Sequence, residues 1–144
     1  MSIKQISVFL VNKPGTLKNM TGVLAAHDVD LRALSLAETK EYGIARLVAD
    51  DTFHALNVLR DADFVASVNS VIAAEVPDEP GALDNLLQIF AEEDVNIEYM
   101  YSFVLSGEDK SAGMIFRVSD ADTAEPKLRN KGLRILSQDD IAQI

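Results

Sequence analysis

The chain of 144 residues contains no cysteine. This absence excludes disulfide bonds, thiolate metal sites and cysteine nucleophiles. It agrees with a reducing compartment, and we expect a cytoplasmic protein. The chain also lacks any apolar run of the roughly 18 residues that a membrane span needs, and residues 1–5 alternate like a strand instead of forming the hydrophobic region of a signal peptide. We therefore expect no membrane association.

Positive charge is scarce. Thirteen Lys and Arg residues face 23 Asp and Glu residues, which gives a formal net charge of −10. Such an acidic chain is repelled by phosphate backbones and by anionic lipid surfaces. Nucleic acid is therefore excluded as an expected partner.

Proline is scarce too, with four residues, yet two of them stand before a glycine in related contexts. The first junction, residues 12–17, reads Asn-Lys-Pro-Gly-Thr-Leu, and the second junction, residues 78–83, reads Asp-Glu-Pro-Gly-Ala-Leu. A second pair of matching segments, 29–31 and 95–97, keeps the same offset of 66 positions. Two matches at one offset indicate an internal duplication.

Both copies show the same order of hydrophobic periodicities. A period of two changes at each Pro-Gly to helical spacing, as in Leu83, Leu86, Leu87 and Phe90. Aspartates at 50–51 and at 120 and 122 offer N-caps for a second helix in each copy, and Pro126 is compatible with that helix only within its first turn. The expected strands are 6–10, 31–39, 44–49 and 64–68 in the first copy, and 72–76, 97–105, 114–118 and 133–136 in the second.

The order strand, helix, strand, strand, helix, strand is the split βαβ arrangement. It predicts an α+β protein made of two ferredoxin-like (βαββαβ) domains, residues 1–68 and 69–144, each with an antiparallel sheet and helices on one face. Units of roughly 70 residues bury too little surface to be very stable alone. We therefore expect the chain to self-associate as a homodimer.

The Pro-Gly junctions carry the chemical signal. Glycine lets a ligand approach the backbone, and free N–H groups at a helix start attract a carboxylate. The amide of Asn12 can donate or accept, and the carboxylate of Asp78 can pair with an ammonium. A free amino acid carries both charges, so it suits such a junction, although Pro-Gly also serves as a plain turn.

The duplicated order, the Asn/Asp-x-Pro-Gly-x-Leu stretch and the Val-Asp/Asn-Leu/Ile stretch after the helix resemble the ACT domain, a small regulatory fold that binds amino acids. The resemblance covers nearly the whole chain as two tandem domains. It implies a ligand held between paired domains by the strand-to-helix loop and the neighbouring second strand. The residues that it implies are Asn12, Pro14, Gly15, Thr16, Leu17, Asp30 and Leu31 in the first copy, and Asp78, Pro80, Gly81, Ala82, Leu83, Asn96 and Ile97 in the second.

The two junctions differ in charge, because Asn12-Lys13 in the first becomes Asp78-Glu79 in the second. The two junctions are therefore not expected to bind a ligand with equal affinity, and a purely structural role for one of them stays open. We expect one principal type of site at a domain or subunit interface. The sequence leaves open which junction holds the ligand.

Other candidate sites are weaker. His27 and His54 lack metal-ligand spacing, which favours surface or packing roles. The aspartates at 120, 122 and 139–140 lack the rest of a calcium loop, and helix caps explain them better. Since no nucleophile, base or acid pair stands out either, we expect no enzyme activity, no metal and no cofactor.

The sequence thus predicts a non-catalytic regulatory module that binds a free amino acid and transmits occupancy to an enzyme of amino-acid metabolism or a transporter. Two alternatives stay open. One is a ligand-free assembly module that regulates such an enzyme, and the other is a small enzyme.

Overall fold

The computed structural model describes residues 2–38, 40–105 and 110–144, and these form two compact units. The first unit comprises residues 4–69, and the second comprises residues 70–144 together with the first three residues of the chain. The predicted boundary between residues 68 and 69 falls inside a strand that runs through both units. Each unit is described by itself.

The first unit contains four strands and two helices in the predicted order. They are β1 (Ile3–Val11), α1 (Thr16–Ala26), β2 (Leu31–Glu38), β3 (Tyr42–Ala49), α2 (Thr52–Asp61) and the first part of β4 (Val65–Pro77). Residue 39, the predicted end of the second strand, lies outside the described residues.

The second unit repeats the series and adds a short helix. Its elements are the second part of β4, α3 (Ala82–Glu92), β5 (Ile97–Phe103), β6 (Ser111–Val118), α4 (Ala121–Asn130), β7 (Arg134–Leu136) and α5 (Gln138–Ala142). The predicted hairpin at 106–110 lies outside the described residues except for Lys110.

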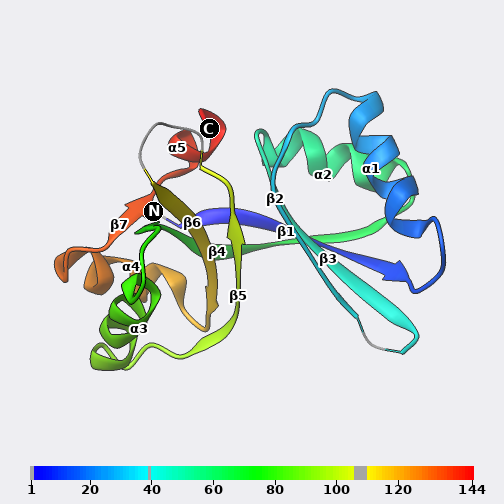
Figure 1. Ribbon diagram of the computed structural model, residues 1–144. Helices are drawn as coiled ribbons and strands as arrows, with labels where there is room; N and C mark the ends of the chain where they lie inside the picture. Colours follow the sequence, from blue (N-terminus) through cyan, green and yellow to red (C-terminus); the bar gives the residue numbers. More distant parts are fainter. Residues whose placement is uncertain (1, 39, 106–109) are drawn as a thin grey trace. The chain divides into compact units, whose positions relative to one another are not determined.

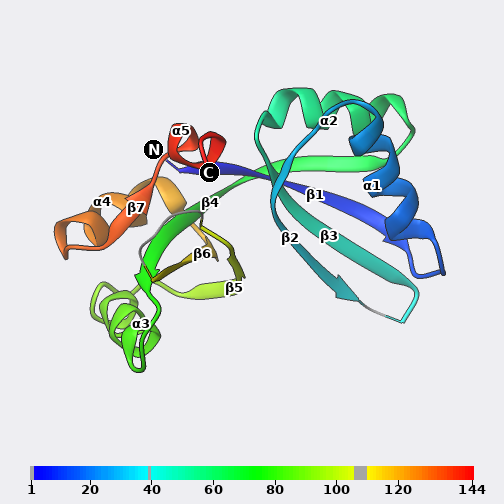
Figure 2. The same ribbon diagram turned by 45° about the horizontal axis from the view of Figure 1, so that its top comes forward.

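The strands of each unit form an antiparallel sheet with the order expected for the split βαβ arrangement. In the first unit the order is β2-β3-β1-β4, and in the second it is β5-β6-β4-β7. Figures 1 and 2 show α1 and α2 on one face of the first sheet, and α3 and α4 on one face of the second. The predicted fold class is confirmed.

One difference from the sequence prediction is that β4 is a single strand of 13 residues, where two strands, 64–68 and 72–76, were expected. No glycine or proline interrupts residues 65–76, so nothing forces the chain to turn between the copies. The end of the first repeat and the start of the second are therefore one element.

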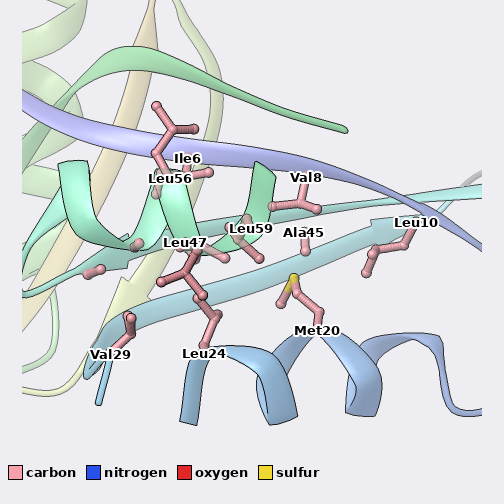
Figure 3. Close-up of a cluster of buried hydrophobic side chains, with 13 residues drawn as sticks. Ile6, Val8, Leu10, Met20, Leu24, Val29, Ala45, Leu47, Leu56 and Leu59 are labelled. Carbon is pink, nitrogen blue, oxygen red and sulfur yellow. The ribbon is translucent and has the colours of Figure 1, made fainter. Parts of the chain in front are cut away.

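Each unit has its own hydrophobic core between sheet and helices. Figure 3 shows Met20 and Leu24 reaching from α1 towards Ala45 and Leu47 on β3. In the second unit, Phe90 on α3 packs against Phe116 on β6 with ring centroids 4.7 Å apart. These contacts follow the predicted periodicities, with alternate residues of each strand facing the helices.

The four long helices all end in the same way. A residue with positive φ follows each helix: Asp28, Asp63, Asp94 and Gly132. The next residue donates its N–H back to the carbonyl five positions earlier, as in Phe64 to Leu59 and Leu133 to Leu128. The two repeats therefore correspond residue by residue even where the side chains differ.

One prediction about the end of the chain was wrong, and one element was not predicted. Pro126 lies in the second turn of α4, where the first turn was expected; its exposed position lets the carbonyl that loses its helical partner face water. The helix α5 was not predicted. Its signal was a capping box, in which Ser137 and Asp140 bond each other's backbone N–H groups.

The aspartate caps should make stability fall in acid. Hydrogen bonds from the hydroxyl and the N–H of Thr123 lower the pKa of Asp120, and the backbone N–H and hydroxyl of Ser137 lower the pKa of Asp140, from the usual 3.8. A carboxyl group whose pKa is lower in the folded state stabilises the fold at pH values above its pKa in the unfolded chain. This stabilisation is lost as the pH falls through its pKa in the folded state. Denaturant titrations should therefore show unfolding free energy dropping below about pH 3.8, and dropping less in Thr123→Val. An unchanged acid slope in Thr123→Val would show that this cap makes no such contribution.

Candidate functional site

The two Pro-Gly junctions adopt the same turn. The N–H of Thr16 donates to the carbonyl of Lys13 at 3.3 Å, and that of Ala82 to Glu79 at 3.2 Å. Gly15 has φ 87° and ψ −9°, and Gly81 has φ 86° and ψ −10°. Proline at the second position and a left-handed glycine at the third define a type II turn. The glycines are thus required by backbone geometry.

These turns leave helix N-termini open. The helices α2, α4 and α5 begin with a side-chain cap from Asp51, Asp120 and Ser137, whereas α1 and α3 begin at glycine and have none. Among the described residues, the N–H groups of the second and third positions of α1 and α3 have no hydrogen-bond acceptor. Unpaired N–H groups at a helix start are suited to an anion.

Most of the predicted site residues lie on the surface around these turns. Asn12, Pro14, Gly15 and Asp30 are exposed in the first unit, where Thr16, Leu17 and Leu31 are half-buried. In the second unit Asp78, Pro80, Gly81, Leu83 and Asn96 are exposed, Ile97 is half-buried and Ala82 is buried. The hydroxyl of Thr16 already donates to the carbonyl of Lys13 at 3.0 Å.

Within one unit the structure does not bring all of these residues together. Pro77, beside the second junction, pairs with Ser111 at the start of β6, while Ile97 pairs with Val118 at its end. Eight residues of strand separate the two ends, about 25 Å. Asn96 and Ile97 are therefore too far from the junction of their own unit to contact the same small ligand.

The first junction borders a small cavity. It measures ≈ 60 Å³ and is lined by residues of β1, the junction, β2 and β3, including Leu10, Leu17, Leu36 and Gly43. A water molecule occupies about 30 Å³ in the liquid. This cavity is therefore much smaller than the sites that hold small molecules.

The second junction borders a much larger cavity, of ≈ 440 Å³, which we call the second-unit cavity. Its apolar wall comes from Val76, Pro77, Ala82, Leu86, Ile89 and Leu133. Two carboxylates, Glu75 and Glu79, and two cations, Lys110 and Arg134, also line it. Its volume is in the range of small-molecule sites, and it carries both signs of charge.

Arg134 and Glu75 form an ion pair at this cavity. Arg134 lies opposite Glu75 in the β7–β4 ladder, and its Nε donates to Oε2 of Glu75 at 2.9 Å. The side chain of Arg134 is 74% exposed, and its charge also acts on the carboxylate of Asp140. An exposed guanidinium can bind a further carboxylate through two parallel hydrogen bonds.

Sequence reasoning missed Glu75, Lys110 and Arg134. None belongs to a motif, and they meet only because β4, β6 and β7 are neighbours in the sheet. One signal was available. Glu75 interrupts the apolar residues of its strand at the position that Phe9 occupies in the first copy.

The post-helix residues have other surroundings. Asp30 accepts from Arg32 at 3.0 Å, and its N–H donates to the carboxylate of Asp50. Asn96 lines a smaller cavity of ≈ 130 Å³ together with Asp94, Asp120 and Lys127. The contacts of Asp30 thus tie the residue before β2 to the end of β3.

The weaker candidates have structural roles. The ring Nε2 of His54 lies 2.8 Å from the carbonyl of His27, and Nδ1 of His27 lies 2.9 Å from the carbonyl of Val23. A carbonyl only accepts, so each of these ring nitrogens carries the proton. In the part of the chain that the structure describes, no group of His, Asp and Glu side chains has a metal-binding arrangement. Nor is any helix there long and apolar enough to cross a membrane.

Comparison with protein-family models gives a match to the ACT domain pair over residues 1–144. A solved structure of a protein from Bacteroides thetaiotaomicron is 35% identical, with a TM-score of 0.91, and the match covers 100% of this chain and 98% of that one. These matches confirm the resemblance inferred from the junctions. Comparison with curated proteins gives no match.

More distant structures share the fold. The regulatory subunit of aspartate kinase from Thermus thermophilus, in a ligand-free form, is 17% identical, with a TM-score of 0.65 and coverage of 90% of both chains. The corresponding subunit from Thermus flavus is also 17% identical, with a TM-score of 0.62 and the same coverage.

Substitution of the turn glycines should cost stability through backbone strain alone. A Cβ at Gly15 or Gly81 would meet no atom within 4 Å, but the positive φ disfavours any L side chain. Gly15→Ala and Gly81→Ala should each lower the unfolding free energy by about 1–2 kcal/mol in denaturant titrations.

Gly22 provides the matched control. It lies inside α1, and a Cβ there would meet only the flexible end of Lys18. Gly22→Ala should raise the unfolding free energy by up to about 1 kcal/mol. Equal effects at all three glycines would refute the role of the left-handed turn.

Proposed function

The chain belongs to the ACT domain pair family, and we propose that it is a non-catalytic regulatory module that binds a free amino acid at the second Pro-Gly junction. The observation that carries this proposal is the difference in space between the two junctions. The first borders a cavity of ≈ 60 Å³ and the second a cavity of ≈ 440 Å³.

Charge alone favours the opposite choice. Lys13 and Lys18 surround the first junction, whereas Asp78, Glu79 and Asp84 surround the second. The difference in cavity volume outweighs this preference, because favourable charges cannot compensate for a cavity that is too small for the ligand. Exposed charges also interact weakly in water, at about 1 kcal/mol or less per pair. Lys110 and Arg134 provide the local cations that the second junction itself lacks.

The proposed ligand lies with its carboxylate towards the terminal nitrogens of Arg134 and towards Lys110. Its ammonium lies towards Glu79, which lines the cavity at the turn. The excess of carboxylates around the junction then attracts the ligand's cationic group and repels simple anions. The pair of opposite charges thus selects a zwitterion.

Regulation in this proposal works through a second copy of the chain. A ligand at the junction cannot also touch Asn96 or Ile97 of its own domain, which lie at the other end of β6. In a homodimer the partner can supply those residues, and binding then stabilises the assembled state. The solved regulatory subunits of aspartate kinase with this fold suggest an enzyme of amino-acid metabolism as the protein that responds.

The binding site is tested by replacing the cation at the cavity. Thermal shift with the free L-amino acids identifies the ligand, and calorimetry gives its affinity. Arg134→Gln should then weaken binding about tenfold, because it removes a charge-assisted hydrogen bond.

Arg60 is the matched control for this test. It is exposed on α2, donates to the carbonyl of Ala66 at 3.2 Å and does not line the cavity. Arg60→Gln should leave the affinity unchanged. Equal affinity in Arg134→Gln and the unmodified chain would remove the second-unit cavity from the site.

An assembly module without a ligand is the second candidate, and one observation favours it. Phe9, Val11 and Tyr42 are 53%, 47% and 53% exposed. Val11 and Tyr42 are cross-strand partners, and Phe9 shares their face of the sheet, opposite the core residues Val8 and Leu10. An exposed apolar patch of this kind is typical of an interaction surface.

Self-association through this patch can be measured directly. Sedimentation equilibrium should show a dimer, and Phe9→Glu should shift it towards monomer by at least tenfold in the dissociation constant. Phe53→Glu, which changes a 76% exposed residue of α2, is the control. A dimer that Phe9→Glu leaves intact would exclude this face, and a dimer without any amino-acid response would favour the assembly module.

A further inference from the structure

We infer that the ligand is an amino acid with a large apolar side chain, which fills the second-unit cavity between α3 and the start of β7. This inference rests on the proposed function, since it names the class of amino acid that the same site takes. It follows from comparing the cavity wall with the corresponding residues of the first repeat.

The two repeats can be compared position by position because their backbones make the same hydrogen bonds. Asn19 and Asn85 each donate to the glycine carbonyl of their turn, at 2.9 and 3.0 Å. Phe64 and Leu133 each follow a left-handed residue and donate to a carbonyl five positions back, at 3.0 and 3.2 Å. Differences in side-chain size at these positions therefore translate directly into space.

Most of the wall residues are smaller in the second repeat. Phe64 of the first repeat packs against its core, and Leu133 stands at the same position in the second. The other reductions are Val76 for Leu10, Ala82 for Thr16, Ser111 for Tyr42 and Gly132 for Asp63, while Leu86 for Met20 leaves the volume nearly unchanged. Three wall positions carry larger residues in the second repeat, namely Ile89 for Val23, Lys110 for Glu41 and Arg134 for Val65. The second repeat therefore carries smaller side chains than the first over most of this wall.

The chemistry of the wall selects the ligand side chain. Ala82 and Leu86 are 8% and 4% exposed, and they form the floor with Val76 and Leu133. The charged groups come from β4, β7, the junction and Lys110, which precedes β6, and the ligand backbone is proposed to bind there. A polar ligand side chain laid against Val76, Ala82, Leu86 and Leu133 would lose water without gaining a partner from them, and the neutral polar side chains elsewhere in the lining are Asn85 and Ser111. A small side chain would leave most of the cavity unfilled.

The test uses the full chain and a panel of free amino acids. L-Leucine, L-isoleucine, L-methionine and L-phenylalanine represent large apolar side chains, and glycine, L-serine, L-aspartate and L-lysine represent the others. Calorimetry should give an affinity at least tenfold higher for the best ligand of the first group than for any of the second, because each buried methylene contributes tenfold or more in such pockets.

Two variants return first-repeat residues to the second repeat. Leu133→Phe should reduce the affinity for the large apolar ligands at least tenfold and leave any weak binding of glycine unchanged. Ala82→Thr makes a smaller change to the wall and should act in the same direction, so it keeps the test valid if Leu133→Phe folds poorly. Phe64→Leu, the reverse change in the first repeat, is the matched control and should leave ligand binding as it is.

The outcomes separate the two claims. If a small or charged amino acid binds best, or if neither variant changes the binding of the large ones, the inference about the side chain is overturned while the proposed function stands. If no amino acid binds at all, the proposed function fails and the inference fails with it. Selective loss of the large apolar ligands in both variants would support both.

Discussion

The left-handed glycine at each strand-to-helix turn is the constraint on which the rest of the site depends. A φ near 87° excludes ordinary side chains, so the position that begins α1 or α3 has no side chain with which to cap the helix. The other helices, α2, α4 and α5, are capped by Asp or Ser. The same glycine therefore closes the turn and exposes the first N–H groups of the helix, which links the fold to the chemistry of the site.

Duplication explains how one junction could change while the fold stayed the same. Each unit has its own core, so the packing that holds one domain does not depend on the wall residues of the other. The second repeat replaces Phe64 by Leu133 and Thr16 by Ala82 without altering the turn or the end of the helix. Losing buried atoms costs stability in proportion to the volume left empty. A ligand that refills this volume offsets the cost, which gives binding a direct thermodynamic link to folding.

The sequence predicted what local patterns encode, and it missed what only the sheet brings together. Alternation and helical spacing were enough for the strand and helix order, and the two Pro-Gly turns were enough for the family. The merging of two predicted strands into β4 was missed because repeat logic implies a boundary between copies. Arg134 and Glu75, 59 positions apart, meet through the β7–β4 register. Such a pairing follows from long-range topology, which no local window contains.

For ligand binding to influence the rest of the chain, some structural element must contact both the ligand site and the other unit. The strand β4 has this property, since Glu75 and Val76 line the second-unit cavity and Val65 to Asn69 belong to the first unit. No glycine or proline lies between these segments of the strand. Coupling still requires that the ligand bind one arrangement of the chain better than another. Arg134 connects these requirements, because its ion pair with Glu75 binds β7 to β4 beside the proposed ligand carboxylate. A ligand whose carboxylate binds Arg134 would therefore perturb the ion pair between β7 and β4, the strand that both units share.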